Sequence, residues 1–118
     1  MKISLVLATL GRDLEVADFL KSLLLQTYKD FELIIIDQNK DGKIDAIVEL
    51  FMNFIDVMHV KVDFTGNARA RDHGIGLARG RIIAFPDDDC AYEKDVLEKV
   101  IAEFKGRRNL YHSGSRFV

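Results

Sequence analysis

Short apolar runs alternate with longer stretches of helical spacing along the whole chain. The first run, residues 3–9, is almost continuously apolar, as a strand covered on both faces would be. Residues 31–36, 57–62 and 81–85 form three further runs rich in β-branched residues. The run at 57–62 alternates apolar and polar positions, which predicts a strand near a sheet edge.

Apolar residues spaced three and four apart predict a helix after each run. The expected helices begin at Asp13, cover about 44–54, run from Asn67 to near Gly80, and follow position 95 as far as Gly106. Asp13 and Asn67 are the expected N-caps. Strands and helices therefore alternate four times, and this order predicts an α/β fold with an open, mostly parallel sheet. The last segment, 109–118, resembles the start of another element that the chain does not complete.

Composition and charge fit one globular domain spanning residues 1–118. Hydrophobic residues make up 48% of the 118 positions and charged residues 31%, which is enough apolar material for a core. The 17 basic and 19 acidic residues give a net charge of −2 without a basic block, which argues against a nucleic-acid partner. A single cysteine, Cys90, and a short N-terminal apolar stretch predict a cytoplasmic protein, with peripheral attachment to a membrane left open.

Polar residues follow three of the predicted strands, at the edge where an open parallel sheet binds its ligands. They are Thr9, Arg12, Asp37, Asp87, Asp88 and Asp89. Three adjacent carboxylates repel one another unless a cation shares them, and in an extended chain Asp87 and Asp89 point to the same side. Two carboxylates so placed suit Mg²⁺ or Mn²⁺. A solvated acidic turn that caps the next helix is the simpler alternative.

Three stretches, in order along the chain, resemble the amino-terminal half of a GT-A-fold, family 2 inverting glycosyltransferase. They are ISLVLATLGR (3–12), SLLLQTYKDFELIIIDQ (22–38) and NARARDHGIGLARGRIIAFPDDD (67–89). The first is similar to the family's opening strand with its Thr-x-x-Arg region, and the second to its S-L-x-x-Q-T-Y helix end and the strand that follows. The third is similar to its A-R-N-x-G helix and D-x-D motif. The resemblance implies a Rossmann-like half that binds a nucleotide-diphosphosugar.

The resemblance also implies a role for each matching residue. The implied nucleotide-sugar-binding residues are Thr9, Arg12, Asp37, Arg71, Asp87 and Asp88. Asp37 would accept a hydrogen bond from the nucleobase, with Thr9, Arg12 and Arg71 beside the base. Asp89, together with Asp87, would bind a divalent metal, Mn²⁺ or Mg²⁺, that bridges the donor's diphosphate. The sequence departs from the family pattern at Ala8, Gln38 and Asp72.

The family's general base and acceptor site lie in its carboxyl-terminal half, and we expect this chain to end before that half begins. The expected role is therefore donor binding, with the acceptor and the catalytic base unknown and little or no turnover by the chain alone. The sheet edge that the other half would cover is expected to be open to self-association.

Two alternatives stay open at this point. A non-catalytic nucleotide-binding or oligomerisation fragment would keep the fold without the reaction. A receiver-like signalling domain has a similar α/β build, but it needs an acidic pair after its first strand, where this chain has Ala8 and Thr9.

Overall fold

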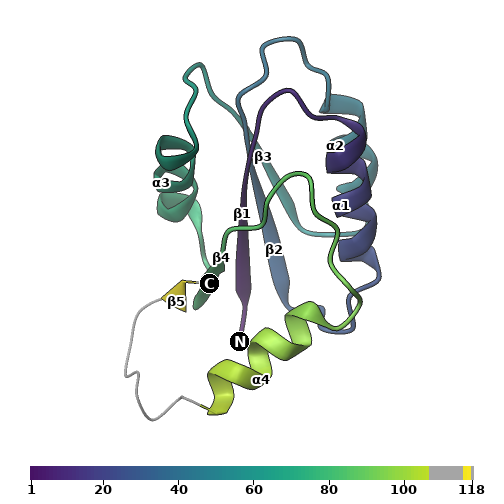
Figure 1. Cartoon of the computed structure of the whole chain (residues 1–118), viewed down its shortest axis with the longest axis vertical. Coiled ribbons are helices and arrows are strands. Elements are labelled where there is room, and N and C mark those ends of the chain that lie inside the picture. Colours follow the sequence, from purple (N-terminus) through teal and green to yellow (C-terminus); the bar gives the residue numbers. More distant parts are fainter. Residues whose placement is uncertain (107–115, 118) are drawn as a thin grey trace.

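The computed structural model of the chain describes residues 1–106 and 116–117. The elements are β1 (Ile3–Thr9), α1 (Leu14–Leu24), β2 (Phe31–Asp37), α2 (Asp45–Phe51), β3 (Val57–Lys61), α3 (Asn67–Leu77), β4 (Ile82–Ala84), α4 (Val96–Gly106) and β5 (Arg116–Phe117). Within this described part, the strands form one parallel sheet in the order β3-β2-β1-β4-β5 (Figure 1). The predicted α/β class and the predicted edge position of β3 are both confirmed. Apart from β5, the segment expected to start another element lies outside the described residues.

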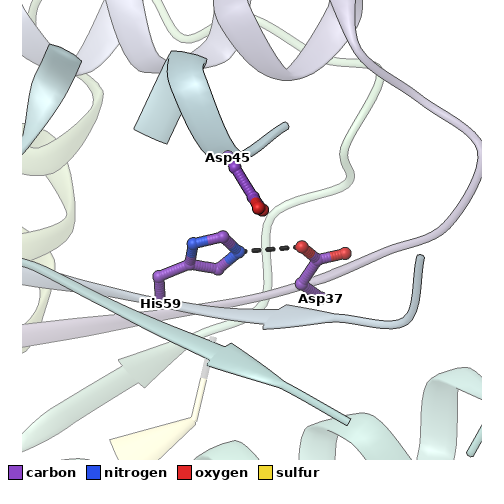
Figure 2. A group of neighbouring side chains, drawn as sticks. All are labelled: Asp37, Asp45 and His59. Atoms are coloured by element: carbon purple, nitrogen blue, oxygen red, sulfur yellow. Dashed lines mark hydrogen bonds and ion pairs between the residues drawn. The ribbon is translucent and has the colours of Figure 1, made fainter. Parts of the chain in front are cut away.

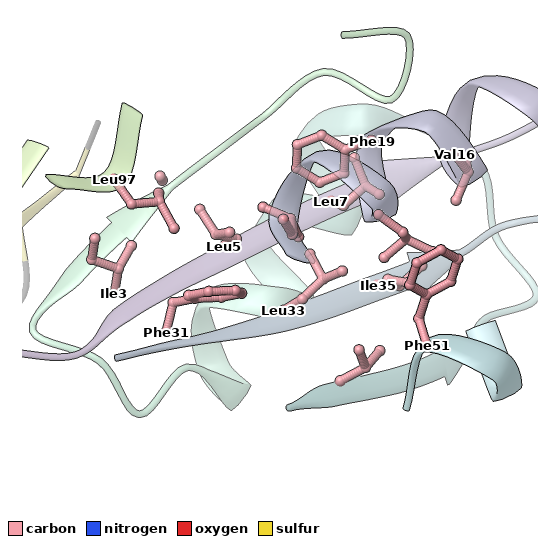
Figure 3. Packing of buried hydrophobic residues seen from close by; sticks show 14 of the residues in the cluster. Ile3, Leu5, Leu7, Val16, Phe19, Phe31, Leu33, Ile35, Phe51 and Leu97 are labelled. Atoms are coloured by element: carbon pink, nitrogen blue, oxygen red, sulfur yellow. The ribbon is translucent and has the colours of Figure 1, made fainter. Parts of the chain in front are cut away.

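Helices cover both faces of the sheet. Figure 1 shows α3 on one side of the sheet and α1 and α2 on the other. Because side chains alternate between the faces of a strand, Leu5 and Leu7 of β1 pack in the core that contains α1, α2 and α4, whereas Val6 packs with residues of α3. The larger core includes Phe19, Leu33 and Ile35, all fully buried (Figure 3). Burying a side chain of this size stabilises the fold by about 1.5–3 kcal/mol.

The two predicted N-caps have different outcomes. Asp13 caps α1, since its carboxylate accepts a hydrogen bond from the backbone N–H of Leu14 at 2.7 Å. The prediction for Asn67 is wrong, because Asn67 is already the first residue of α3 and Gly66 is the N-cap. Gly66 has φ +130°, a conformation that a residue with a β-carbon rarely adopts, and the chain uses this glycine to turn into the helix.

The order of the strands reverses direction at β1. The chain adds β2 and β3 on one side of β1 and then crosses to the other side for β4. In open α/β sheets, ligands bind beyond the carboxyl ends of the strands at such a reversal. The order also differs from the 2-1-3-4-5 arrangement of receiver-like domains. Across the described residues, no helix is both long and apolar enough to cross a membrane.

Candidate functional site

A cavity of about 200 Å³ opens at the carboxyl ends of β1 and β4. Its lining residues are Ala8, Leu10, Arg12, Asn67, Arg71, Pro86, Asp87 and Asp88. Four of the residues predicted to bind a nucleotide sugar are among them, although they come from three separate parts of the chain. The cavity therefore brings two guanidinium groups and two carboxylates to one place.

Thr9 and Arg12 tie the end of β1 to the acidic segment that follows β4. The Thr9 hydroxyl donates a hydrogen bond to Asp88 Oδ2 at 3.0 Å. Arg12 Nε lies 3.7 Å from Asp88 Oδ1, and Arg12 Nη2 lies 3.8 Å from Asp89 Oδ2. The hydrogen bond to Glu15 and the charge of Asp88 raise the pKa of Arg12, so the guanidinium keeps its charge beside these carboxylates.

Asp87 and Asp89 lie together at the exposed rim of the cavity. Asp87, Asp89 and Cys90 each offer a ligand atom within 4.8 Å of the other two. Asp87 and Asp89 are brought close together by a turn at residues 88–89, whereas the sequence predicted an extended backbone there. In this turn the Cys90 N–H donates a hydrogen bond to the Asp87 carbonyl at 3.4 Å. Partial desolvation, followed by the charges of Asp89 and Asp87, raises the pKa of the Cys90 thiol. Asp87 and Asp89 thus offer two carboxylates as potential ligands, and hard oxygens of this kind fit Mg²⁺ or Mn²⁺.

Arg71 reaches the cavity from α3. Its guanidinium carbon lies 5.4 Å from the centre of the Phe85 ring, and the side chain lines the cavity. Arg69, two residues earlier, instead lies 4.4 Å from the centre of the Phe64 ring. The two arginines therefore use different faces of the helix, as their spacing requires.

Asp37, predicted to contact the nucleobase, does not line this cavity. The residue is fully buried. Its Oδ1 accepts hydrogen bonds at 2.9 Å from both the backbone N–H and the side-chain amide of Asn39, and its Oδ2 lies 2.8 Å from His59 Nε2. A direct contact between Asp37 and a nucleobase therefore stays a prediction, and it needs the Asn39 side chain to turn away.

Two amides that sequence reasoning did not assign to the site join three loops beside Asp37. Asn39 Oδ1 accepts from the Gly11 N–H at 2.7 Å, and Gln38 Oε1 accepts from the Gly66 N–H at 2.7 Å. Both amides line a second, open cavity of about 480 Å³. Their position directly after a buried strand is the signal that could have identified them.

Comparison with known proteins identifies the family. The sequence model described as "Glycosyl transferase family 2" matches residues 4–117. An uncharacterized glycosyltransferase of Rickettsia conorii is 39% identical over 102 residues, which are 82% of this chain and 16% of the relative. The glucosyl-dolichyl phosphate glucuronosyltransferase of Haloferax volcanii is 27% identical over 121 residues, which cover 100% of this chain and 39% of the relative.

Solved structures show the same fold. The crystal structure of Staphylococcus aureus TarS 1–349 in complex with UDP has a TM-score of 0.84 at 24% identity, covering 92% of this chain and 33% of that one. The mannosyltransferase PcManGT of Pyrobaculum calidifontis has a TM-score of 0.78 at 18% identity, covering 86% of this chain and 32% of that one. This chain thus spans well under half the length of these relatives. The match across nearly the whole sequence shows that the chain belongs to glycosyl transferase family 2.

Proposed function

We propose that the described residues bind the nucleoside diphosphate part of a nucleotide-sugar donor for glycosyl transfer. The observation that carries this proposal is the single cavity at the β1–β4 edge. Arg12, Arg71, Asp87 and Asp88 line it, and Thr9 is hydrogen-bonded to Asp88. Similar folds add support, since TarS has been solved with UDP and with UDP-GlcNAc, and PcManGT with GDP-Man and Mn²⁺.

Asp87 and Asp89 are the residues that would hold a divalent metal, Mn²⁺ or Mg²⁺. They are exposed, they offer carboxylate oxygens within 4.8 Å of each other, and a turn fixes their spacing. Such a cation supplies charge neutralisation for a diphosphate leaving group. Arg12 and Arg71 add guanidinium groups, whose N–H donors match phosphate oxygens in geometry and charge.

The nucleobase end of the proposed site lies toward Asp37, Gln38 and Asn39. Asn39 holds the loop after β1 through the Gly11 N–H, so it lies between Asp37 and the open cavity that it lines. When the Asn39 side chain turns aside, Asp37 Oδ1 loses the amide donor, keeps the bond from the Asn39 backbone N–H, and can accept from a base N–H. Asp37 therefore keeps its proposed role, with Asn39 as the group that a base must displace.

Transfer also needs a general base and an acceptor site. We assign neither to the described residues, and the acceptor of the proposed reaction stays open. Self-association through an exposed sheet edge also stays a proposal. The role proposed for the described residues is donor binding.

Calorimetric titration with UDP, GDP and dTDP, each with and without Mn²⁺, tests the proposal. We expect at least one nucleotide to bind in the presence of Mn²⁺ and to bind more weakly without it. Asp89→Asn should remove this dependence on Mn²⁺, because it removes one of two charged ligands. Asp18→Asn, a matched change on the exposed face of α1, should leave it intact.

The possible results separate the proposal from its competitors. Metal-dependent binding that Asp89→Asn abolishes supports a donor site at the β1–β4 edge. If none of the three nucleotides binds in a metal-dependent way, the donor-site assignment is wrong. Nucleotide release from several nucleotide sugars, followed in the same samples, distinguishes a catalytic chain from a fragment that only binds.

A further inference from the structure

A second group of potential ligands lies at the carboxyl ends of β2 and β3, on the face that α2 covers. Asp37 ends β2, His59 lies within β3, and Asp45 begins α2. Figure 2 shows the Asp45 carboxylate pointing toward the His59 ring and the Asp37 carboxylate. One ligand atom from each residue lies within 4.8 Å of the other two. The cavity that contains Asp87 is lined by none of these three side chains.

One carboxylate oxygen of this group, Asp45 Oδ1, lacks a hydrogen-bond partner. Asp45 Oδ2 is paired with Lys61 Nζ at 2.6 Å, but Asp45 Oδ1 is buried and has no hydrogen-bond partner. Across the described part of the chain it is the only buried side-chain nitrogen or oxygen in that condition. Leaving such a group unsatisfied costs about 1–3 kcal/mol, so an ion or a water molecule is expected at this oxygen.

The charges of the group point to a cation. Asp37 is fully buried, and the His59 side chain is 14% exposed. Among the described residues, Lys61 is the only lysine or arginine within ion-pair distance of either carboxylate. The group therefore sets two carboxylates, one of them fully buried, against one lysine ammonium, so a cation between the carboxylates would be favourable.

We propose that Asp37, Asp45 and His59 form a Zn²⁺ site. Imidazole nitrogen with carboxylate oxygen is a common donor set for Zn²⁺, and three protein ligands leave a fourth position for water. The imidazole distinguishes this group from Asp87 and Asp89, whose donors are carboxylate oxygens suited to Mg²⁺ or Mn²⁺.

Binding of Zn²⁺ requires a change of the His59 tautomer and a small movement of Asp45, without net gain or loss of a proton. His59 binds through Nε2 as the neutral tautomer with its proton on Nδ1, so the hydrogen bond to Asp37 Oδ2 is replaced by one bond from each residue to the ion. Tetrahedral zinc ligands lie about 3.3–3.5 Å apart, given bonds of about 2.0–2.2 Å, so Asp45 must turn inward. Oδ1 has no hydrogen bond to lose, but the carboxylate turns as a unit, so the contact of Oδ2 with Lys61 Nζ shifts with it.

The zinc site would join α2 to the edge of the sheet and does not rest on the proposed donor function. It uses Asp37 Oδ2, whereas the nucleobase proposal uses Asp37 Oδ1, the oxygen held by Asn39. A zinc ion would thus hold the Asp37 carboxylate through the oxygen that Asn39 does not contact.

Titration with Zn²⁺ alone, without nucleotide, tests the site. A Cys90→Ser background removes the thiol that could compete for zinc at Asp87 and Asp89. We expect one Zn²⁺ to bind, to shift the NMR resonances of the His59 ring but not those of His73, and to raise the melting temperature. His59→Gln and Asp45→Asn should each weaken binding more than about 100-fold, beyond the 10–100-fold typical for outer partners of a metal.

His73→Gln is the matched control, because His73 is exposed on α3 and contacts Phe64, away from the three ligands. It should bind Zn²⁺ as the parent does. Circular dichroism checks folding, and if His59→Gln does not fold, the half-exposed Asp45→Asn decides. The proposal is wrong if the parent binds no Zn²⁺, or if both ligand variants bind it as the parent does. Neither result bears on nucleotide binding, which is measured separately with Mn²⁺.

Discussion

The Thr9 hydroxyl donates a hydrogen bond to Asp88 Oδ2 at 3.0 Å, although the two residues are 79 positions apart in the chain. Thr9 is buried at the end of β1, and the Asp88 side chain is 19% exposed on the segment after β4. This contact fixes the acidic segment against the first strand. The proposed metal ligands on either side of Asp88 thereby acquire a defined position.

Breaking this contact should destabilise the protein. Thr9→Val keeps the shape of the side chain but leaves Asp88 Oδ2 without its donor, so the free energy of unfolding should fall by about 1–2 kcal/mol. A double-mutant cycle by urea denaturation should show coupling between Thr9→Val and Asp88→Ala. The same cycle with Asp87→Ala is the control and should show none, since the Thr9 hydroxyl bonds only Asp88 among the described residues.

Arg71 and Arg69 should differ in their effect on nucleotide affinity. Arg71 lines the proposed donor cavity, whereas Arg69 lies over the Phe64 ring. Arg71→Gln should weaken nucleotide binding about 10- to 100-fold, because a hydrogen bond to a charged group is worth about 1.5–3 kcal/mol. Arg69→Gln should leave the affinity unchanged in the same calorimetric titration. Equal losses in both variants would indicate that general positive charge, not the cavity, attracts the nucleotide.

Two glycines of α3 should respond to alanine in opposite ways. A β-carbon at Gly74 would lie 2.3 Å from Val6 Cγ1, whereas one at Gly76 would meet nothing within 4 Å. Gly74→Ala should therefore destabilise the fold by about 1–3 kcal/mol through overpacking. Gly76→Ala, in the last turn of α3, should stabilise it by about 0.4–1 kcal/mol, because alanine fits the backbone there and restricts the unfolded chain. Thermal unfolding of both variants measures the difference, and a stabilising Gly74→Ala would contradict the observed packing of α3 on β1.

Glu32 should make stability depend on pH in the acid range. Burial acts to raise the pKa of this carboxyl, but hydrogen bonds from Ser4 and Arg79 outweigh it and lower the pKa from its usual 4.5. The stabilisation is therefore fully present above the unfolded-state pKa and is lost as the pH falls through the lower folded-state pKa. Denaturation curves measured from pH 6 to below pH 4.5 should show this loss, and Glu32→Gln should reduce it. Glu49→Gln, on the exposed side of α2, should leave the pH profile as it is.

Much of the fold could be predicted because the pattern of apolar and polar residues within each segment indicates whether that segment forms a strand or a helix. The continuous apolar runs of β1 and β2 marked strands buried on both faces, and the alternation of β3 marked an edge strand. The Asp13 cap was also predictable, since its carboxylate bonds to the next residue. The start of α3 was not, because it depends on the positive φ of Gly66, and the spacing of apolar residues does not report backbone conformation.

The candidate site was predictable only as a set of residues. The sequence placed Thr9, Asp37 and the three aspartates at strand ends, and the family motifs attached roles to them. It did not indicate that Asp37 is enclosed by Asn39 and His59, because those contacts depend on the register of β2 against β3 and on the turn after β2. The spacing of residues in the sequence did not indicate His59 as a possible metal ligand, since Asp37 and Asp45 belong to two other elements, β2 and α2.

The sequence by itself determined the alternation of strands and helices, the family, and which residues stand at the carboxyl ends of the strands. These properties depend on side-chain periodicity and on motifs that are contiguous in the chain. Only the tertiary structure decided that Thr9 holds Asp88, that Arg71 and Arg12 share a cavity, and that Asp45 leaves an oxygen unsatisfied beside His59. The physical reason is that such contacts form between elements far apart in sequence, so their geometry exists only once the sheet has been assembled.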